Sequence, residues 1–86
     1  MAHKFIITGK EFKMGKSIVQ NSIRKLRFLN GELTQQDLAD AVGVTRATVV
    51  SIEKGNYNPS LELAFRISRF FEKNIKDIFY VEEQDE

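Results

Sequence analysis

Side chains that suit contact with the edges of DNA bases recur along one face of a short predicted helix, at Arg46, Ala47, Val50 and Ser51. An arginine guanidinium can donate two parallel hydrogen bonds to guanine O6 and N7. Alanine and valine offer apolar contact to thymine methyl groups, and a serine hydroxyl bonds to several bases. The same residues also have interpretations without base contact. Arg46 suits a phosphate contact or a surface ion pair, Val50 suits partial burial, and Thr48 fits either a base contact or the helix surface.

Polar side chains also surround the two ends of this helix. They are suited to bind the sugar-phosphate backbone, which gives affinity and salt dependence but little sequence information. Tyr57 and Asn58 can equally serve only to build the loop before Pro59. The candidate backbone-contacting residues at these ends are Thr45, Lys54, Asn56, Tyr57 and Asn58.

Two short helices joined at Gly43 would position this face. Thr34 is typical of a helix N-cap, and Asp37 three residues later completes a capping box with Asp in place of Glu. Gly43 suits a left-handed turn, and Thr45 suits the cap of the next helix. This is the pattern of a helix-turn-helix, whose second helix enters the DNA major groove. The apolar residues expected on the buried faces are Leu38, Ala39, Val42, Val44, Val49 and Ile52.

Three further helices are expected around this pair. The first spans about 22–29, with Asn21 as its cap and Asn30-Gly31 as its stop. The fourth opens at Pro59 and Ser60, and a short fifth follows Asn74. The buried stripe expected on the fourth helix comprises Leu61, Leu63, Ala64, Ile67, Phe70 and Phe71, and the fifth contributes Ile75, Ile78 and Phe79.

Five short motifs recur together in one known family of DNA-binding domains: Leu33-Thr-Gln, Ala39, Gly43-Val-Thr, Ile52-Glu-Lys-Gly and Asn58-Pro-Ser. By these residues the chain resembles the phage repressor/Cro (Xre-type) family, and most of all its small stand-alone prokaryotic repressors such as the cytolysin operon repressor. The resemblance covers about 21–79. It implies a mainly α fold, a compact five-helix lambda-repressor-like DNA-binding domain with short N- and C-terminal β-strands.

The resemblance also implies roles for individual residues. It pairs Arg27 with Glu53 in a partly buried structural ion pair. It gives Gln35 a phosphate contact at a helix N-terminus, where free N–H groups and the helix dipole favour anions. By the same analogy Ile18-Val19 forms a strand that pairs with Tyr80-Val81.

Length, composition and charge limit the other possibilities. The 86 residues suffice for one domain, and they include no Cys for a disulfide or thiolate metal site. His3 is the single His, no Ser has a His partner, and no glycine-rich phosphate loop occurs. We therefore expect no enzyme, cofactor or metal. Without a signal peptide or long apolar run, we expect a cytoplasmic protein that does not bind membranes.

Charge is distributed unevenly along the chain, although the formal net charge is only +1. Residues 1–20 carry four Lys and one Glu, whereas the acidic tail, residues 82–86, carries four carboxylates and no cation. We divide the chain into a leader (1–16), the helix-turn-helix domain (17–81) and the acidic tail. The leader is either a hairpin turning at Gly9-Lys10 or an upstream extension ahead of Met14. Acidic tails commonly serve solubility, and this one can also repel DNA locally.

The expected function is sequence-specific transcriptional regulation, most simply repression, by a homodimer on a palindromic operator in double-stranded DNA. One such domain contacts too few base pairs for useful specificity, which argues for a dimer. Phe79, Tyr80 and Val81 are the expected interface, with internal packing as the alternative. Two other functions stay open, an antitoxin-type interaction module with a protein partner at residues 1–20 and the controller protein of a restriction-modification system.

Overall fold

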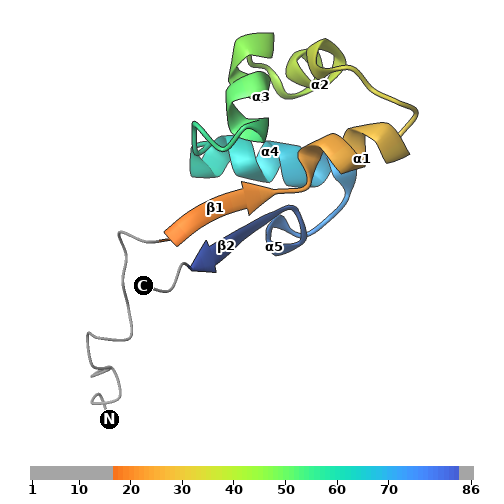
Figure 1. The fold of residues 1–86 in the computed structure, drawn as a ribbon. Coiled ribbons are helices and arrows are strands. Elements are labelled where there is room, and N and C mark those ends of the chain that lie inside the picture. The colour runs from red at the N-terminus through yellow and green to blue at the C-terminus, as the bar shows by residue number, and fades with distance from the viewer. Residues whose placement is uncertain (1–16, 84–86) are drawn as a thin grey trace, which may run out of the picture.

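The computed structural model describes residues 17–83, which form five short helices and a two-stranded sheet (Figure 1). The order confirms the predicted fold class. The predicted hairpin at Gly9-Lys10 lies outside the described residues. In chain order the elements are β1 (Ser17–Asn21), α1 (Ile23–Leu29), α2 (Gln35–Val42), α3 (Arg46–Glu53), α4 (Leu61–Phe71), α5 (Ile75–Ile78) and β2 (Phe79–Glu83).

The predicted capping box fixes the start of α2. The amide of Asp37 donates to Thr34 Oγ1 at 2.9 Å, and the amide of Thr34 donates to Asp37 Oδ2 at 3.0 Å. The hydrogen bond from the Thr34 amide, and to a smaller extent the Thr34 side chain, lowers the pKa of the Asp37 carboxyl below its ordinary value of 3.8, because each favours the charged form. Gly43 ends α2 in the left-handed conformation, with φ of +80°. Thr45 then caps α3 by accepting from the Thr48 amide.

The capping box predicts a defined pH dependence of stability. A carboxyl with a depressed folded pKa contributes stability above its unfolded pKa and loses it as pH falls through the folded pKa. Asp37→Asn should therefore be less stable than the wild type near pH 7, and the gap should narrow as pH falls from about 4 through the folded pKa. Urea unfolding of both proteins at several pH values measures the gap. A gap that stays constant down to pH 2.5 would show that the Asp37 charge contributes nothing.

Helix α1 starts one residue later than predicted. Ser22 occupies the cap position without a side-chain hydrogen bond. Asn21 performs part of the expected role, because its Oδ1 accepts from the amide of Ile23 at 3.2 Å. Its Nδ2 donates to the carbonyl oxygen of Ile52 at 2.9 Å. One side chain thus joins the end of β1 to the end of α3.

A second tie holds the C-terminal end of α2. Arg66 on α4 donates from Nη1 to the carbonyl oxygen of Val42 at 2.6 Å and pairs with Glu62 one turn earlier. A carbonyl in the last turn of a helix lacks an intrahelical partner, so the guanidinium satisfies it. A Cβ atom added at Gly43 would lie 3.2 Å from the same Nη1. Gly43 therefore meets two demands, a positive φ and room for Arg66.

The core confirms most of the predicted apolar positions and contradicts two. Leu61 and Phe70, both expected in the buried stripe of α4, are 70% and 40% exposed. The buried part of α4 is narrower than its apolar periodicity indicates, because the other helices cover only one side of it. The buried core comprises Ile23, Leu26, Leu38, Ala39, Val42, Val49, Ile52, Leu63, Ala64, Ile67, Phe71 and Ile78.

The strands pair antiparallel below the helices in Figure 1. In the backbone register Val19 lies opposite Val81, as the resemblance implies, Ile18 pairs with Glu82, and Gln20 pairs with Tyr80. No helix within residues 17–83 is long and apolar enough to cross a membrane.

Candidate nucleic-acid interface

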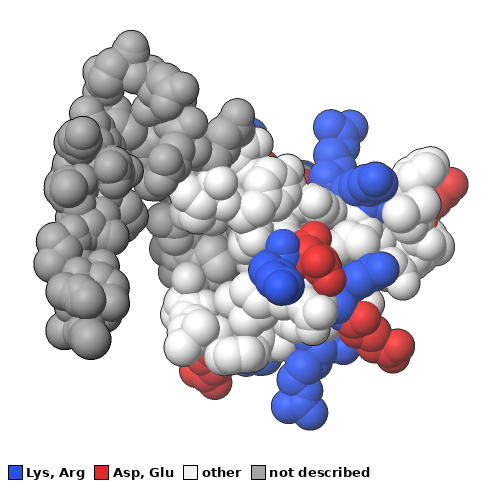
Figure 2. Space-filling view, turned by 90° about the horizontal axis from the view of Figure 1, so that it is seen from below, with Lys and Arg blue, Asp and Glu red and all other residues white. Residues whose placement is uncertain are grey.

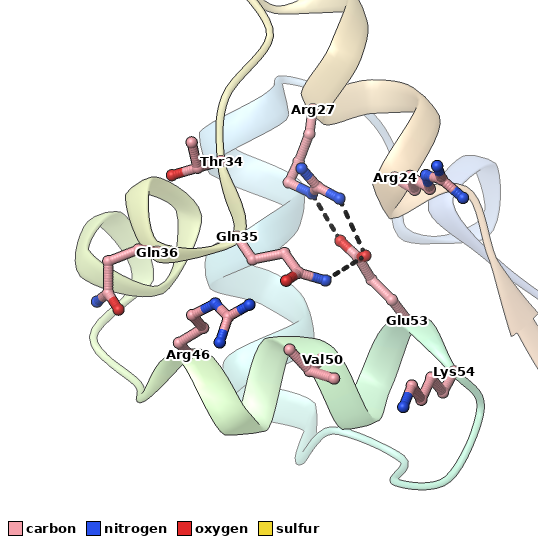
Figure 3. A pocket seen from close by; sticks show the side chains of 9 residues that line it. All are labelled: Arg24, Arg27, Thr34, Gln35, Gln36, Arg46, Val50, Glu53 and Lys54. Atoms are coloured by element: carbon pink, nitrogen blue, oxygen red, sulfur yellow. Dashed lines mark hydrogen bonds and ion pairs between the residues drawn. The ribbon is translucent and has the colours of Figure 1, made fainter.

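A notch of about 600 Å³ lies between the start of α2 and the outward side of α3 (Figure 3). Helix α3 contributes Arg46, Val50 and Lys54, which are spaced by four residues and follow one another along the helix in Figure 3. The start of α2 contributes the opposite wall. The residues lining the notch are Arg24, Arg27, Thr34, Gln35, Gln36, Arg46, Val50, Glu53 and Lys54.

A nearly buried carboxylate, Glu53, lies on the inner side of this notch. Arg27 Nε donates to its Oε2 at 2.7 Å, and Arg27 Nη2 donates to its Oε1 at 3.1 Å. Gln35 Nε2 donates to the same Oε1 at 3.1 Å from the other side, as Figure 3 shows. The Arg27 and Glu53 side chains are only 14% and 9% exposed. The ion pair that the resemblance implied is therefore present, and Gln35 completes it.

The notch suits an anion. Its four lysine and arginine side chains face a single carboxylate, which Arg27 and Gln35 already engage. Arg24, Arg46 and Lys54 are exposed, and within residues 17–83 none of them forms an ion pair. The capping box satisfies the amide of Asp37 and leaves the amides of Gln35 and Gln36 at the open end of α2. Cationic side chains beside a helix N-terminus form a favourable place for phosphate.

The other predicted contact residues line a second hollow of about 300 Å³ beside α3, namely Ala47, Thr48, Ser51, Asn56 and Tyr57. The hydroxyls of Thr48 and Thr45 lie 3.1 Å apart and share a hydrogen bond. Thr45 and Asn58 line neither hollow; both are exposed, at the start of α3 and in the loop before α4. The two hollows flank α3, so its outward face is open along its length.

Comparison with known proteins assigns the fold a family. The helix-turn-helix family model matches residues 23–78. The chain belongs to the helix-turn-helix family. As a member, it is a DNA-binding transcriptional regulator and not an enzyme.

Relatives of this helix-turn-helix protein occur in archaea and bacteria. An uncharacterized HTH-type transcriptional regulator of Methanocaldococcus jannaschii is 48% identical over 67 residues, which are 78% of this chain and all of the relative. The HTH-type regulator YgzD of Bacillus subtilis is 43% identical over the same shares. The crystal structure of the transcriptional regulator VanUg superposes with a TM-score of 0.65 at 26% identity, covering 80% of this chain and 91% of that one.

Two residues of the notch were missed by the sequence analysis. Arg24 lies on α1, three residues before Arg27 and therefore on the same side of the helix. Gln36 follows Gln35 in the first turn of α2. The spacing of Arg24 from Arg27 could have indicated its position, whereas the approach of α1 to α3 depends on tertiary packing. Within residues 17–83 no three His, Cys, Asp or Glu side chains gather as metal ligands would.

The network around Glu53 predicts unequal effects of two cation deletions in this helix-turn-helix protein. Arg27→Ala leaves a nearly buried carboxylate without its ion-pair partner and should cost about 3 kcal/mol of unfolding free energy. Lys54→Ala removes an exposed cation and should change stability by no more than about 0.5 kcal/mol. Denaturant unfolding of both variants measures the difference. Equal losses would show that the ion pair does not stabilise the fold.

Proposed function

We propose that this regulator is a cytoplasmic repressor that binds a palindromic operator as a homodimer, with α3 in the major groove. One observation carries the proposal, the open outward face of α3 between two hollows, with the free cation Arg46 at its start. An α-helix fits the major groove of B-DNA, and side chains near the start of a recognition helix contact base edges. The resemblance to small stand-alone repressors supports repression as the mode of action.

The two sides of α3 support different roles. Arg46 extends from the first turn and suits guanine, and the apolar Ala47 and Val50 suit thymine methyl groups. Val50 is half-buried in the notch, so its contact would involve only its outer methyl group. We propose base contacts from Arg46, Ala47, Thr48, Val50 and Ser51.

Phosphate contacts would orient the domain on the duplex. Hydrogen bonding to Glu53 holds the Gln35 side chain, so the phosphate contact of Gln35 uses its main-chain amide at the start of α2 and the remaining capacity of its side chain. Arg24 adds a cation on the same side of the notch. We propose backbone contacts from Gln35, Thr45, Lys54, Asn56, Tyr57 and Asn58, with Arg24 as a further one.

The proposed dimer uses the sheet. Tyr80 and Val81 on β2 are 46% and 58% exposed, while Phe79 packs partly against the core. Seen from below, the blue and red side chains gather on the side away from the grey residues, and a mostly white area lies between them (Figure 2). A two-fold interface through Phe79, Tyr80 and Val81 would place two copies of α3 on half-sites about one helical turn apart.

One experiment tests both the palindromic operator and the homodimer. Selection of bound duplexes from a random DNA pool, with the protein mass measured at the same salt concentration, should give a palindrome bound by a dimer. No enrichment, together with a monomeric mass, would refute the proposal and favour an interaction module. Enrichment of an asymmetric site would refute the two-fold arrangement alone.

Arg46→Ala should relax preference at one symmetric base position, at a cost of about 1–3 kcal/mol for the preferred base. The Arg46 guanidinium can donate to both guanine acceptors, O6 and N7, whereas an alanine side chain has no donor. Lys54→Ala serves as the control, since loss of a phosphate contact weakens binding to all sequences and lowers the salt slope by about one. Titrations on the selected site and its single-base variants measure both effects. An Arg46→Ala protein that loses affinity uniformly would place Arg46 on the phosphates.

A further inference from the structure

A groove of about 560 Å³ lies between the outer side of α1 and β2, and among its lining residues only Arg24 also lines the notch. Its lining is aromatic and cationic. Phe28, 65% exposed, and Tyr80 supply two rings, and Arg24 and Lys25 supply two cations without an ion pair within residues 17–83. Asn21 and Ser22 complete the lining.

We propose that this groove binds the acidic tail, residues 82–86, of a second copy of the chain, which rests on the homodimer proposed above. The tail carries four carboxylates in five residues and begins two residues after Tyr80, which lines the groove. Its charge complements Lys25, which lines this groove and not the notch. Carboxylates can also accept from the Tyr80 hydroxyl, and the stems of the glutamate side chains can cover the Phe28 ring.

The tail of the same chain is poorly placed to fill the groove. Tyr80 pairs with Gln20 near α1, whereas Glu83 pairs with Ser17 at the opposite end of the sheet. The strand thus leads away from the groove by about 10 Å between Tyr80 and Glu83. At Glu83 the direction of β2 is therefore away from the groove of the same chain.

A two-fold axis perpendicular to β2 resolves this difficulty. It reverses the strand direction, so the tail of one copy points toward the α1 end of the other sheet. The groove also adjoins the proposed interface, because Tyr80 belongs to both. A standard interface buries roughly 800 Å² per partner. Phe79, Tyr80 and Val81 offer only a fraction of that area, and the groove with its tail would enlarge the interface on both copies.

Removing the charge of Lys25 in the groove, or the charges of the tail, should weaken the dimer, because both changes break the same contact. We expect Lys25→Gln, and separately a tail carrying E82Q, E83Q, D85N and E86Q, each to raise the dimer dissociation constant about tenfold at 0.1 M salt. The variant that combines both sets of substitutions should raise the dissociation constant by much less than the product of the two separate increases. The losses should shrink at about 1 M salt, where the screening length falls to about 3 Å. Arg69→Gln, an exposed cation on α4 outside the groove, is the matched control.

Sedimentation equilibrium gives the dissociation constants. A dimer whose constant is unaffected by both neutralisations would overturn the proposed tail contact while leaving the dimer intact. Multiplicative losses would show that groove and tail act independently, which also overturns it. A wild-type chain that is monomeric at all concentrations would overturn the dimer, and the tail contact with it.

A distance measurement distinguishes contact between copies from contact within one. The chain has no Cys, so Glu86→Cys provides a single attachment point for a nitroxide spin label. The labelled protein is mixed with ¹⁵N-labelled wild type. We expect selective broadening of the ¹⁵N amide signals of Lys25 and Phe28, which reduction of the nitroxide reverses. A second sample carries the nitroxide and ¹⁵N on the same chain. Broadening in that sample but not in the mixed one would refute the proposal. No broadening in a mixed sample that is dimeric by mass would also refute it.

Discussion

The carboxylate of Glu53 lies where α1, α2 and α3 approach one another, and little of it reaches water. A charge in such a place is stable only when its oxygens are paired, because desolvation of an isolated carboxylate costs several kcal/mol. Arg27 provides the charge from α1 and Gln35 a further hydrogen bond from α2. Arg27 also donates to the carbonyl of Leu33, so one guanidinium fixes the connection between α1 and α2 as well. The position of α3 relative to its two neighbours depends on this network.

The network also decides the electrostatic character of the notch. Without Arg27 and Gln35, Glu53 would present a negative charge beside the proposed phosphate sites, and phosphate would be repelled. Because its oxygens are engaged, the exposed charges left around the notch are Arg24, Arg46 and Lys54. The interaction that stabilises the fold therefore also makes this surface suitable for a polyanion.

Local rules explain which features could be predicted from the sequence. The capping box of Thr34 and Asp37 and the left-handed Gly43 follow from neighbours within a few residues, and the structure confirms them. Leu61 and Phe70 fit the apolar period of α4 but are exposed, because periodicity cannot indicate how much of a helix its neighbours cover. The Gln35–Glu53 hydrogen bond joins residues 18 apart in sequence. Its existence depends on how α2 crosses α3, which no local pattern specifies.

The sheet has a consequence for how such a domain can be combined with others. Because Ser17 lies opposite Glu83, both ends of the described chain leave from the same end of one two-stranded ribbon, on the side away from α3 in Figure 1. A second module fused at either end would occupy the same region of space and would leave the α3 surface unobstructed. Joining Ser17 to Glu83, as a circular permutation does, would need only a short linker. The two-stranded sheet is thus a site at which other domains could be fused without changes to the DNA-binding helices.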